Sequence, residues 1–190
     1  MNVSVIIPAL NEEHTVAEVV RACLADDPLE VLVIDADSTD ATASRAAAAG
    51  ADVRNWRDIL SEEPRPGKGE SLWRGVAAAK GDIVVFVDAD LESAAPGMVA
   101  ALAAPFVDPA VGMVKARYQR SLNGQPTGGG RVTELTAKPL IKQFFPELAH
   151  IDQPLGGEYA LRRDTALELP FVEGYGVEAG LLVDVGKQAT

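Results

Sequence analysis

Two carboxylates, Asp88 and Asp90, follow directly on an apolar run in the middle of the chain. The run, residues 83–87, holds five apolar and mostly β-branched side chains, a pattern typical of a strand buried on both faces of a parallel sheet. In open α/β sheets, ligands bind beyond the carboxyl ends of the strands. Carboxylate oxygens suit a hard divalent cation that carries nucleotide phosphates. The pair therefore predicts a metal and nucleotide site, with a simple turn after a strand as the alternative.

Three further loop segments follow expected strands and carry groups that a nucleotide needs. They span residues 8–12, 35–40 and 66–70. Loops of this kind lie along one edge of a doubly wound sheet, so their polar groups can converge on one ligand. Glu12 and either Asp35 or Asp37 can accept hydrogen bonds from a base or ribose, and Lys68 between two glycines can approach a diphosphate. Taken singly, each has an ordinary alternative as a helix-terminal charge, a turn residue or a solvated lysine.

A second anion site is predicted where three glycines, residues 128–130, precede Arg131 and Thr133. Backbone N–H groups at a helix amino terminus, a guanidinium and a hydroxyl together suit a phosphate or a carboxylate. The alternative is a flexible linker followed by an ordinary helix start.

Missing sequence patterns argue against a P-loop hydrolase, a nicotinamide dehydrogenase, a serine hydrolase and a zinc site. Residues 67–70 do not form a Walker A loop, because no Ser or Thr follows Lys68. No G-x-G-x-x-G follows the first expected strand, and the chain has neither a G-x-S-x-G elbow nor a Cys/His cluster. Trp56 and Trp73 are interpreted as packing residues, and His150 receives no role.

The elements that must position these residues alternate along the chain. Strands are expected at residues 3–7, 31–34, 51–53, 83–87, 111–115 and, after a turn, within 154–163. Helices are expected at residues 11–24, 38–50, 71–80, 94–106 and 131–143, with a short one after Asp164. This alternation predicts a single α/β domain over residues 1–190, with a Rossmann-like, mostly parallel sheet flanked by helices.

Local signals set the expected boundaries of these elements. Pro8 should end the first strand, and the segment 11–13 should open the first helix. Ser38 or Thr39 should cap the second helix. Asp164 should cap the short helix that begins directly after this aspartate.

Composition narrows the class of protein. The 190 residues are 47% hydrophobic and 24% charged, as in a soluble globular domain. The net charge of −11 argues against binding to nucleic acid or to an anionic membrane surface. The amino terminus lacks a basic region before its apolar run, and no segment reaches the roughly 18 apolar residues of a membrane span. With Cys23 as the single cysteine, we expect a cytoplasmic protein.

Seven segments, taken in order, resemble the glucosyl-3-phosphoglycerate synthases, which are retaining nucleotide-sugar glycosyltransferases with a GT-A fold. They are PALNEE (8–13), VIDADSTD (33–40), RPGKGESLWR (65–74), GDIVVFVDAD (81–90), GGGRVTEL (128–135), QPLGGEYA (153–160) and GYGVEAGLLVD (174–184). The resemblance spans nearly the whole chain. It implies transfer of glucose from UDP-glucose to the 2-hydroxyl of 3-phosphoglycerate, with retention and with Mg²⁺ or Mn²⁺.

The resemblance also implies roles for matching residues. Together with the acceptor Asp35 proposed above, the donor-binding set is Pro8, Leu10, Glu12, Asp35, Lys68 and Asp88. Asp90 is implied to bind the metal, while Asp88, Lys68 and Glu178 form the catalytic set. Gly130, Arg131 and Thr133 are implied to hold the phosphate of 3-phosphoglycerate. The donor half would be about residues 1–90 and the acceptor half about 91–190, and a homodimer stays open.

Two departures from the family keep alternatives open. Ala36 stands where the family often has a small polar residue or a second aspartate, which leaves GDP-mannose as an alternative donor. Family members also continue into a segment whose histidine completes the metal site, whereas this chain diverges after Asp184, and neither of its histidines matches. This difference favours, as an alternative, an incomplete acceptor half and a non-catalytic nucleotide-sugar-binding module. A nucleotidyltransferase is the third and weaker alternative.

Overall fold

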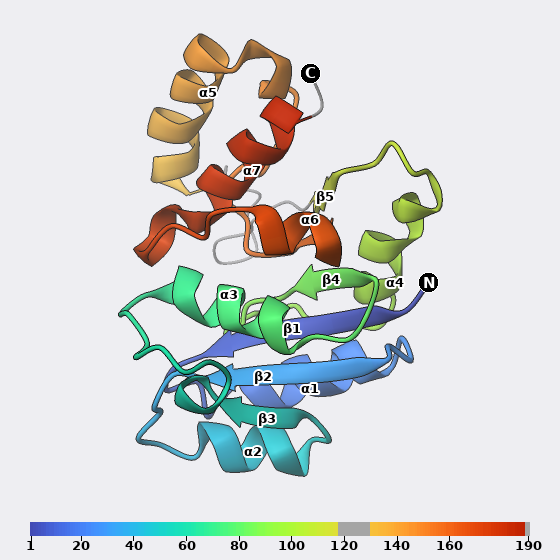
Figure 1. Cartoon of the computed structure of the whole chain (residues 1–190), viewed down its shortest axis with the longest axis vertical. Coiled ribbons are helices and arrows are strands. Elements are labelled where there is room, and N and C mark those ends of the chain that lie inside the picture. Colours follow the sequence, from blue (N-terminus) through green and yellow to red (C-terminus); the bar gives the residue numbers. More distant parts are fainter. Residues whose placement is uncertain (118–129, 189–190) are drawn as a thin grey trace.

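The computed structural model describes residues 1–117 and 130–188, which build one mixed sheet of six strands in the order β3-β2-β1-β4-β6-β5. The strands are β1 (Val3–Ala9), β2 (Glu30–Asp35), β3 (Asp52–Asn55), β4 (Ile83–Phe86), β5 (Met113–Lys115) and β6 (Tyr159–Arg162). Neighbours among β1 to β4 pair in parallel, whereas β6 pairs antiparallel with both β4 and β5. The predicted mostly parallel sheet is confirmed, and Figure 1 shows its parallel strands pointing the same way.

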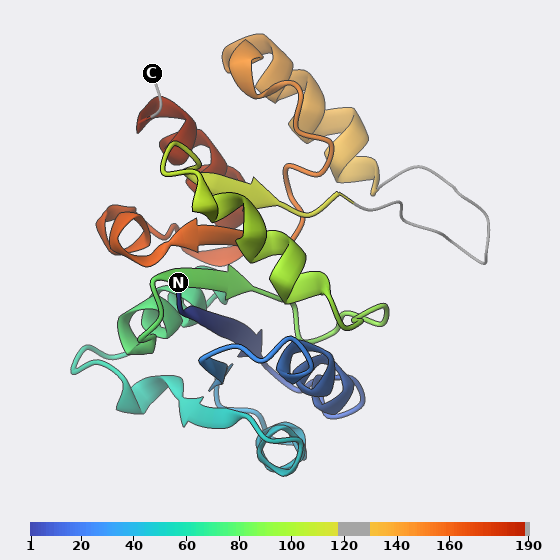
Figure 2. The same ribbon diagram turned by 90° about the vertical axis from the view of Figure 1, so that its right-hand side faces the viewer.

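Helices cover both faces of this sheet. On one face lie α1 (Val16–Leu24), α2 (Thr42–Ala48) and α4 (Met98–Ala103), and on the other α3 (Lys68–Ala78), α6 (Arg163–Glu168) and α7 (Val177–Gln188). Helix α5 (Lys138–Phe144) stands away from the sheet beside α7, where Ile141 and Leu182 share a small apolar cluster (Figures 1 and 2). Short helical turns lie at Trp56–Asp58, Ala104–Val107, Pro146–Leu148 and Gly174–Gly176.

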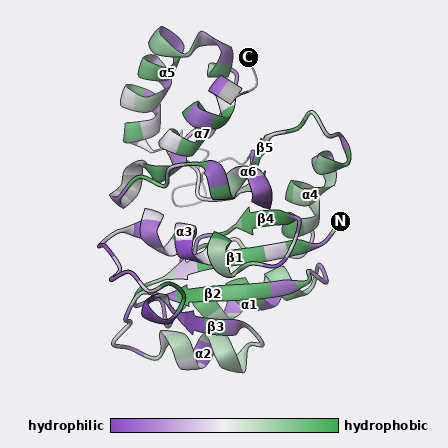
Figure 3. Ribbon diagram, in the orientation of Figure 1, coloured by the Kyte–Doolittle hydropathy of each residue, from purple (hydrophilic) through white to green (hydrophobic). Residues whose placement is uncertain are grey.

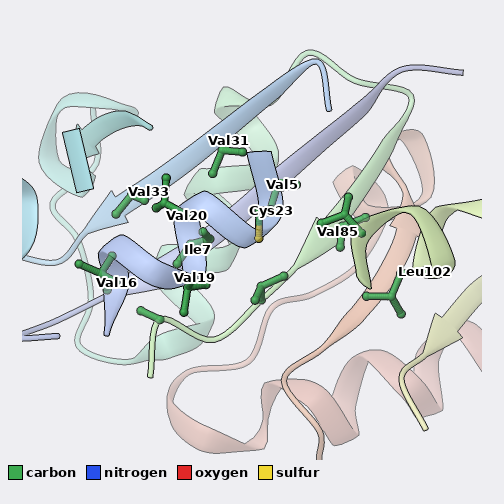
Figure 4. Packing of buried hydrophobic residues seen from close by; sticks show 14 of the residues in the cluster. Val5, Ile7, Val16, Val19, Val20, Cys23, Val31, Val33, Val85 and Leu102 are labelled. Atoms are coloured by element: carbon green, nitrogen blue, oxygen red, sulfur yellow. The ribbon is translucent and has the colours of Figure 1, made fainter. Parts of the chain in front are cut away.

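Strand β1 has apolar side chains on both faces because both faces are covered. Val5 and Ile7 point into the cluster under α1, while Ile6 between them joins the opposite cluster under α3, and all three are fully buried. Figure 4 shows Val16, Val19 and the neighbouring side chains of α1 packed onto this strand, and in Figure 3 the central strands are the most apolar part of the molecule. Full burial of each aliphatic side chain contributes about 1.5–3 kcal/mol.

The prediction that Pro8 ends the first strand is wrong, because β1 continues to Ala9. The Ile6 carbonyl points toward β4 and accepts a hydrogen bond from the Val87 N–H. Pro8 lies two residues later, so its nitrogen points the same way, but it lies beyond Ile6, the last residue of β1 that pairs with β4. The missing N–H of Pro8 therefore removes no ladder hydrogen bond.

The first two helices begin later than predicted. Helix α1 starts at Val16 rather than within 11–13, since Asn11 has a φ of 58° and cannot sit in a right-handed helix. Neither Ser38 nor Thr39 caps α2, which starts at Thr42 without a side-chain cap. Both residues instead bond to Asn11: Ser38 Oγ accepts from its N–H at 3.0 Å, and the Thr39 N–H donates to its Oδ1 at 2.9 Å.

Two other boundaries also differ from the prediction. Helix α3 begins three residues early, at Lys68, directly after Gly67 with its φ of 130°. Asp164 does not cap α6; it lies inside the first turn, and Arg162 occupies the cap position without a side-chain hydrogen bond.

The helix predicted over residues 131–143 is present, with a wide π-type turn at Thr133–Ala137 before α5. The wide turn comes just before Pro139, whose ring would collide with the carbonyl four residues back in a regular α-helix. Two of the three glycines of the predicted anion site, residues 128 and 129, lie outside the described residues. Within the described part of the chain, no helix is long and apolar enough to cross a bilayer.

Candidate functional site

A cleft of about 300 Å³ opens at the carboxyl ends of β1 and β4. The predicted residues on its wall are Pro8, Leu10, Glu12, Ala36, Lys68, Asp88 and Asp90. They come from segments that are far apart in sequence, which the parallel strands bring to one edge of the sheet. The expected convergence of these loops is therefore found in the structure.

Neither Asp35 nor Asp37 is among the residues that line this cleft. Asp37 accepts hydrogen bonds from Asn55 at 2.9 Å, Trp56 at 3.0 Å and Arg57 at 2.8 Å, and these bonds lower the pKa of its carboxyl. Asp37 thus fixes the segment after β3. Asp35 is buried, and its Oδ2 accepts from the Ser38 N–H at 3.3 Å.

The centre of the site is a lysine held between two carboxylates. Lys68 Nζ lies 2.5 Å from Asp88 Oδ1 and 2.6 Å from Glu178 Oε1, so the start of α3, the end of β4 and the start of α7 meet here. Burial opposes the charged form of Lys68, but attraction to the two carboxylates outweighs it and raises the pKa of the ammonium. The lysine is therefore a fixed positive charge at the end of the cleft.

Close backbone contact makes this meeting possible. A Cβ on Gly67 would fall 2.5 Å from the Gly174 nitrogen, and one on Gly69 would overlap the Val172 carbonyl oxygen. The two glycines let the first turn of α3 lie against the segment before α7, which carries Glu178. The glycines on either side of Lys68 thus serve chain packing as well as access to a ligand.

The carboxylates on the cleft wall act on one another. Burial raises the pKa of Glu12, and the negative charges of Asp90, Asp40 and Asp88 raise it further.

Within the described residues, no cluster of three or more His, Cys, Asp or Glu could hold a metal ion on its own. Oxygen ligands from one or two carboxylates fit Mg²⁺ or Mn²⁺ when phosphate oxygens complete the shell, so these residues fit a divalent cation that arrives with a diphosphate.

A second cleft, of about 920 Å³, lies on the other side of Asp88 and Asp90, which line both clefts. Its wall includes Lys115 at the end of β5 and Glu158 just before β6. Gly130, Arg131 and Thr133 are not among the residues of either wall. They lie at the start of the helical segment before α5, where Arg131 is exposed and Thr133 is buried.

Some residues of the site had no signal in the sequence. Trp56, interpreted as a packing residue, lines the first cleft while also packing against the core. Ser71 lines the same cleft from the first turn of α3. The backbone of Gly157 packs against the Asp88 side chain. The paired glycines of the motif QPLGGEYA could have indicated this contact, because glycine often marks a close backbone approach.

Comparison with known proteins gives one consistent result. The model of the family described as glycosyl transferase family 2 matches residues 4–167. The chain is 50% identical to the glucosyl-3-phosphoglycerate synthase of Mycolicibacterium paratuberculosis, over 96% of this chain and 59% of that protein. It is 45% identical to the synthase of Petrotoga mobilis, over 99% and 62%. The chain therefore spans about three fifths of the length of these curated relatives.

Solved structures agree with the sequence comparison. The Mycobacterium tuberculosis glucosyl-3-phosphoglycerate synthase in complex with Mn²⁺, UDP-glucose and phosphoglyceric acid superimposes with a TM-score of 0.90 and 44% identity, over 99% of this chain and 66% of that one. A second complex of the same synthase, with Mn²⁺, UDP and glucosyl-3-phosphoglycerate, also gives 0.90, at 46% identity. The predicted GT-A type of sheet is confirmed by this likeness.

Proposed function

The chain belongs to glycosyl transferase family 2, and on that basis we propose that it transfers glucose from UDP-glucose to the 2-hydroxyl of 3-phosphoglycerate with retention at the anomeric carbon. The observation that carries the proposal is the Lys68 ammonium between Asp88 and Glu178, where the two clefts share the Asp88 and Asp90 carboxylates. A donor in one cleft and an acceptor in the other would then meet at this cluster. The ligands of the similar synthases support this assignment of substrates.

The smaller cleft suits the nucleotide. Pro8, Leu10 and Ala36 offer small and apolar surface for a base, and Trp56 adds one aromatic wall. Asp35 directly precedes Ala36, so in this proposal it supports the base pocket from below. Glu12 is placed to accept from the ribose.

The diphosphate would lie between Lys68 and Asp90, which both line this cleft. Lys68 would stabilise the charge that builds on the leaving phosphate, and Asp90, with Glu12 and Asp88 close by, would hold Mg²⁺ or Mn²⁺. When bound, the cation neutralises negative charge on the diphosphate.

The ion pairs of Lys68 with Asp88 and Glu178 bear on how the hexose is transferred. The bond between the anomeric carbon and the β-phosphate oxygen breaks, and the acceptor oxygen bonds to the same face of the carbon while its proton passes to the leaving phosphate. Asp88 and Glu178 are both ion-paired to Lys68, which reduces the nucleophilicity of either carboxylate. This pairing favours attack by the acceptor over a covalent glycosyl-enzyme, with the chain acting through position and charge.

The acceptor would enter from the larger cleft. Arg131 and Thr133 stay our proposed phosphate ligands, as the resemblance implies, and Gly130 precedes them at a helix start where N–H groups are free of helical partners. Binding of 3-phosphoglycerate would require this segment to approach the cleft that Lys115 lines.

Release of nucleoside diphosphate tests the proposal. We expect release from UDP-glucose that depends on both 3-phosphoglycerate and magnesium, and that falls at least about 100-fold in Asp90→Asn. Asp164→Asn, on the exposed first turn of α6, is the matched control and should keep the wild-type rate. Release with GDP-mannose instead of UDP-glucose would replace the donor in this proposal, and release of pyrophosphate from UTP would point to a nucleotidyltransferase. Metal-dependent binding of UDP-glucose without any release would leave a binding module.

A further inference from the structure

Lys115, at the end of β5, is a second lysine beside the site, and the transfer chemistry above gives it no task. Its ammonium donates a hydrogen bond to the Gly156 carbonyl at 2.7 Å and lies 4.7 Å from the centre of the Tyr159 ring. The ammonium group is thus bonded to the turn before β6 and lies over the ring of Tyr159 in β6.

The turn that Lys115 holds is the one that touches Asp88. Gly157 follows Gly156, and a Cβ at Gly157 would fall 2.5 Å from Asp88 Oδ1 and still closer to Oδ2. The backbone of the turn therefore packs directly on the carboxylate that binds Lys68. A shift of the turn would give this carboxylate room to rotate away from the ammonium.

Four charged groups from neighbouring segments act on Lys115. Glu178 of α7, Glu158 before β6 and Asp88 after β4 attract its charge, while Lys68 of α3 repels it. Burial is the largest effect and lowers the pKa of Lys115 to about 8, although the three carboxylates oppose the change. Lys115 is therefore the group in this cluster that changes charge just above neutral pH.

We infer that Lys115 is a positioning residue for the hexose: by holding the Gly156 carbonyl it fixes the turn that keeps the Asp88 carboxylate on Lys68. The inference rests on the proposed function, because it assumes that the hexose of the donor lies beside Asp88. The uridine end of the donor lies in the other cleft, which Lys115 does not line. Loss of Lys115 should therefore weaken binding of the hexose more than binding of the nucleotide.

Calorimetry with UDP-glucose and with UDP, both in magnesium, separates the two effects. In Lys115→Met we expect the affinity for UDP-glucose to fall about tenfold relative to the affinity for UDP, which should change less than about threefold. Lys80→Met is the control, since Lys80 is exposed and precedes β4 at the opposite edge of the sheet. It should leave the ratio of the two affinities as in the wild type.

The wild type supplies a second measurement that needs no variant. Between pH 7 and pH 9.5 Lys115 loses its charge, so the affinity ratio should move toward that of Lys115→Met, whose own ratio should stay constant. A ratio that is the same in wild type and Lys115→Met, or affinities for UDP and UDP-glucose that fall together, would overturn the inference and leave the proposed function standing. A wild type that binds neither ligand would refute the proposed function and this inference with it.

Discussion

Replacement of Gly157 by alanine tests the link between backbone packing and chemistry. The new Cβ would lie 2.5 Å from Asp88 Oδ1 and closer to Cγ and Oδ2, whereas carbon and oxygen atoms normally stay about 3.4 Å apart. The turn or the carboxylate must therefore move by about 1 Å. Asp88 is the easier of the two to move, because its side chain can rotate away from Lys68, while the turn is tied to Lys115.

A displacement of this size has a calculable effect on the rate. Misplacing a reacting group by about 1 Å commonly costs about 100-fold, which corresponds to about 2.7 kcal/mol in the activation barrier. We therefore expect Gly157→Ala to lower kcat for acceptor-dependent UDP release about 100-fold. The affinity for UDP, measured by calorimetry, should change far less than kcat, because Gly157 does not line the nucleotide cleft and Asp88 is the one residue of its wall that the added Cβ would meet.

Gly176→Ala is the matched control for this experiment. Gly176 is close in sequence to Glu178, but the nearest atom to its added Cβ would be Val172 Cγ2 at an ordinary 3.9 Å. This variant should keep kcat within about threefold of wild type. If Gly157→Ala retained more than a third of the wild-type kcat, the Asp88 carboxylate would not need the position that the glycine gives it.

Three further predictions concern buried groups. Arg74 is fully buried and donates to a carboxylate and three carbonyls, so Arg74→Met should lower the free energy of unfolding by about 3–5 kcal/mol in urea titrations. The control Arg54→Met, at a partly exposed arginine paired with Asp52, should lower it by about 1 kcal/mol or less. Burial raises the pKa of the Cys23 thiol to about 12, so a chromogenic disulfide reagent at pH 8 should react only after unfolding; rapid reaction of the folded protein would contradict this. Lys115 has a folded pKa of about 8, below its ordinary 10.5, so the unfolded chain binds more protons between these values. The stability of the wild type relative to Lys115→Met should therefore rise from pH 8 to pH 10.5, and a flat difference in denaturant titrations would refute the shift.

The strand before Asp88 could be predicted because its pattern has one stable environment. An unbroken apolar run of β-branched residues must be covered on both faces, and the side chains of β4 alternate between the apolar clusters on the two faces of the sheet. The position of Asp88 and Asp90 at the edge of the sheet followed from that one element. The fold class followed in the same way from the alternation of strands and helices.

The wrong boundaries have a common physical cause, which is contact between distant segments. Ser38 and Thr39 carry a local signal for a helix cap, but Asn11 from the loop after β1 takes their hydrogen bonds. Similarly, the place of Pro8 depends on where β4 stops, and nothing near Pro8 in the sequence records that. Local propensity is overruled where a distant segment takes the hydrogen bonds of a capping residue, as Asn11 does. It is also overruled where no neighbouring strand requires the N–H that a proline lacks.

The ion pairs of the site were beyond sequence reasoning for the same reason. Lys68 was predicted to meet a diphosphate, and the structure places it between two carboxylates, one of them Glu178 from a distant helix. Lys115 carries no local signal for its contact with the turn, since a lysine at a strand end is usually solvated, and the paired glycines hint only at a close backbone approach. Only the packing of β5 and β6 beside β4 turns them toward Asp88.

The charges of the site explain how an acidic chain could bind anionic ligands. The net charge of −11 repels phosphates over the whole surface, so attraction must come from groups held inside the clefts. Lys68 is such a group, but Asp88 and Glu178 already compete for its charge. A diphosphate must therefore share this lysine with two carboxylates, and the proposed function makes donor binding depend strongly on a divalent cation at Asp90 to offset the excess of negative charge.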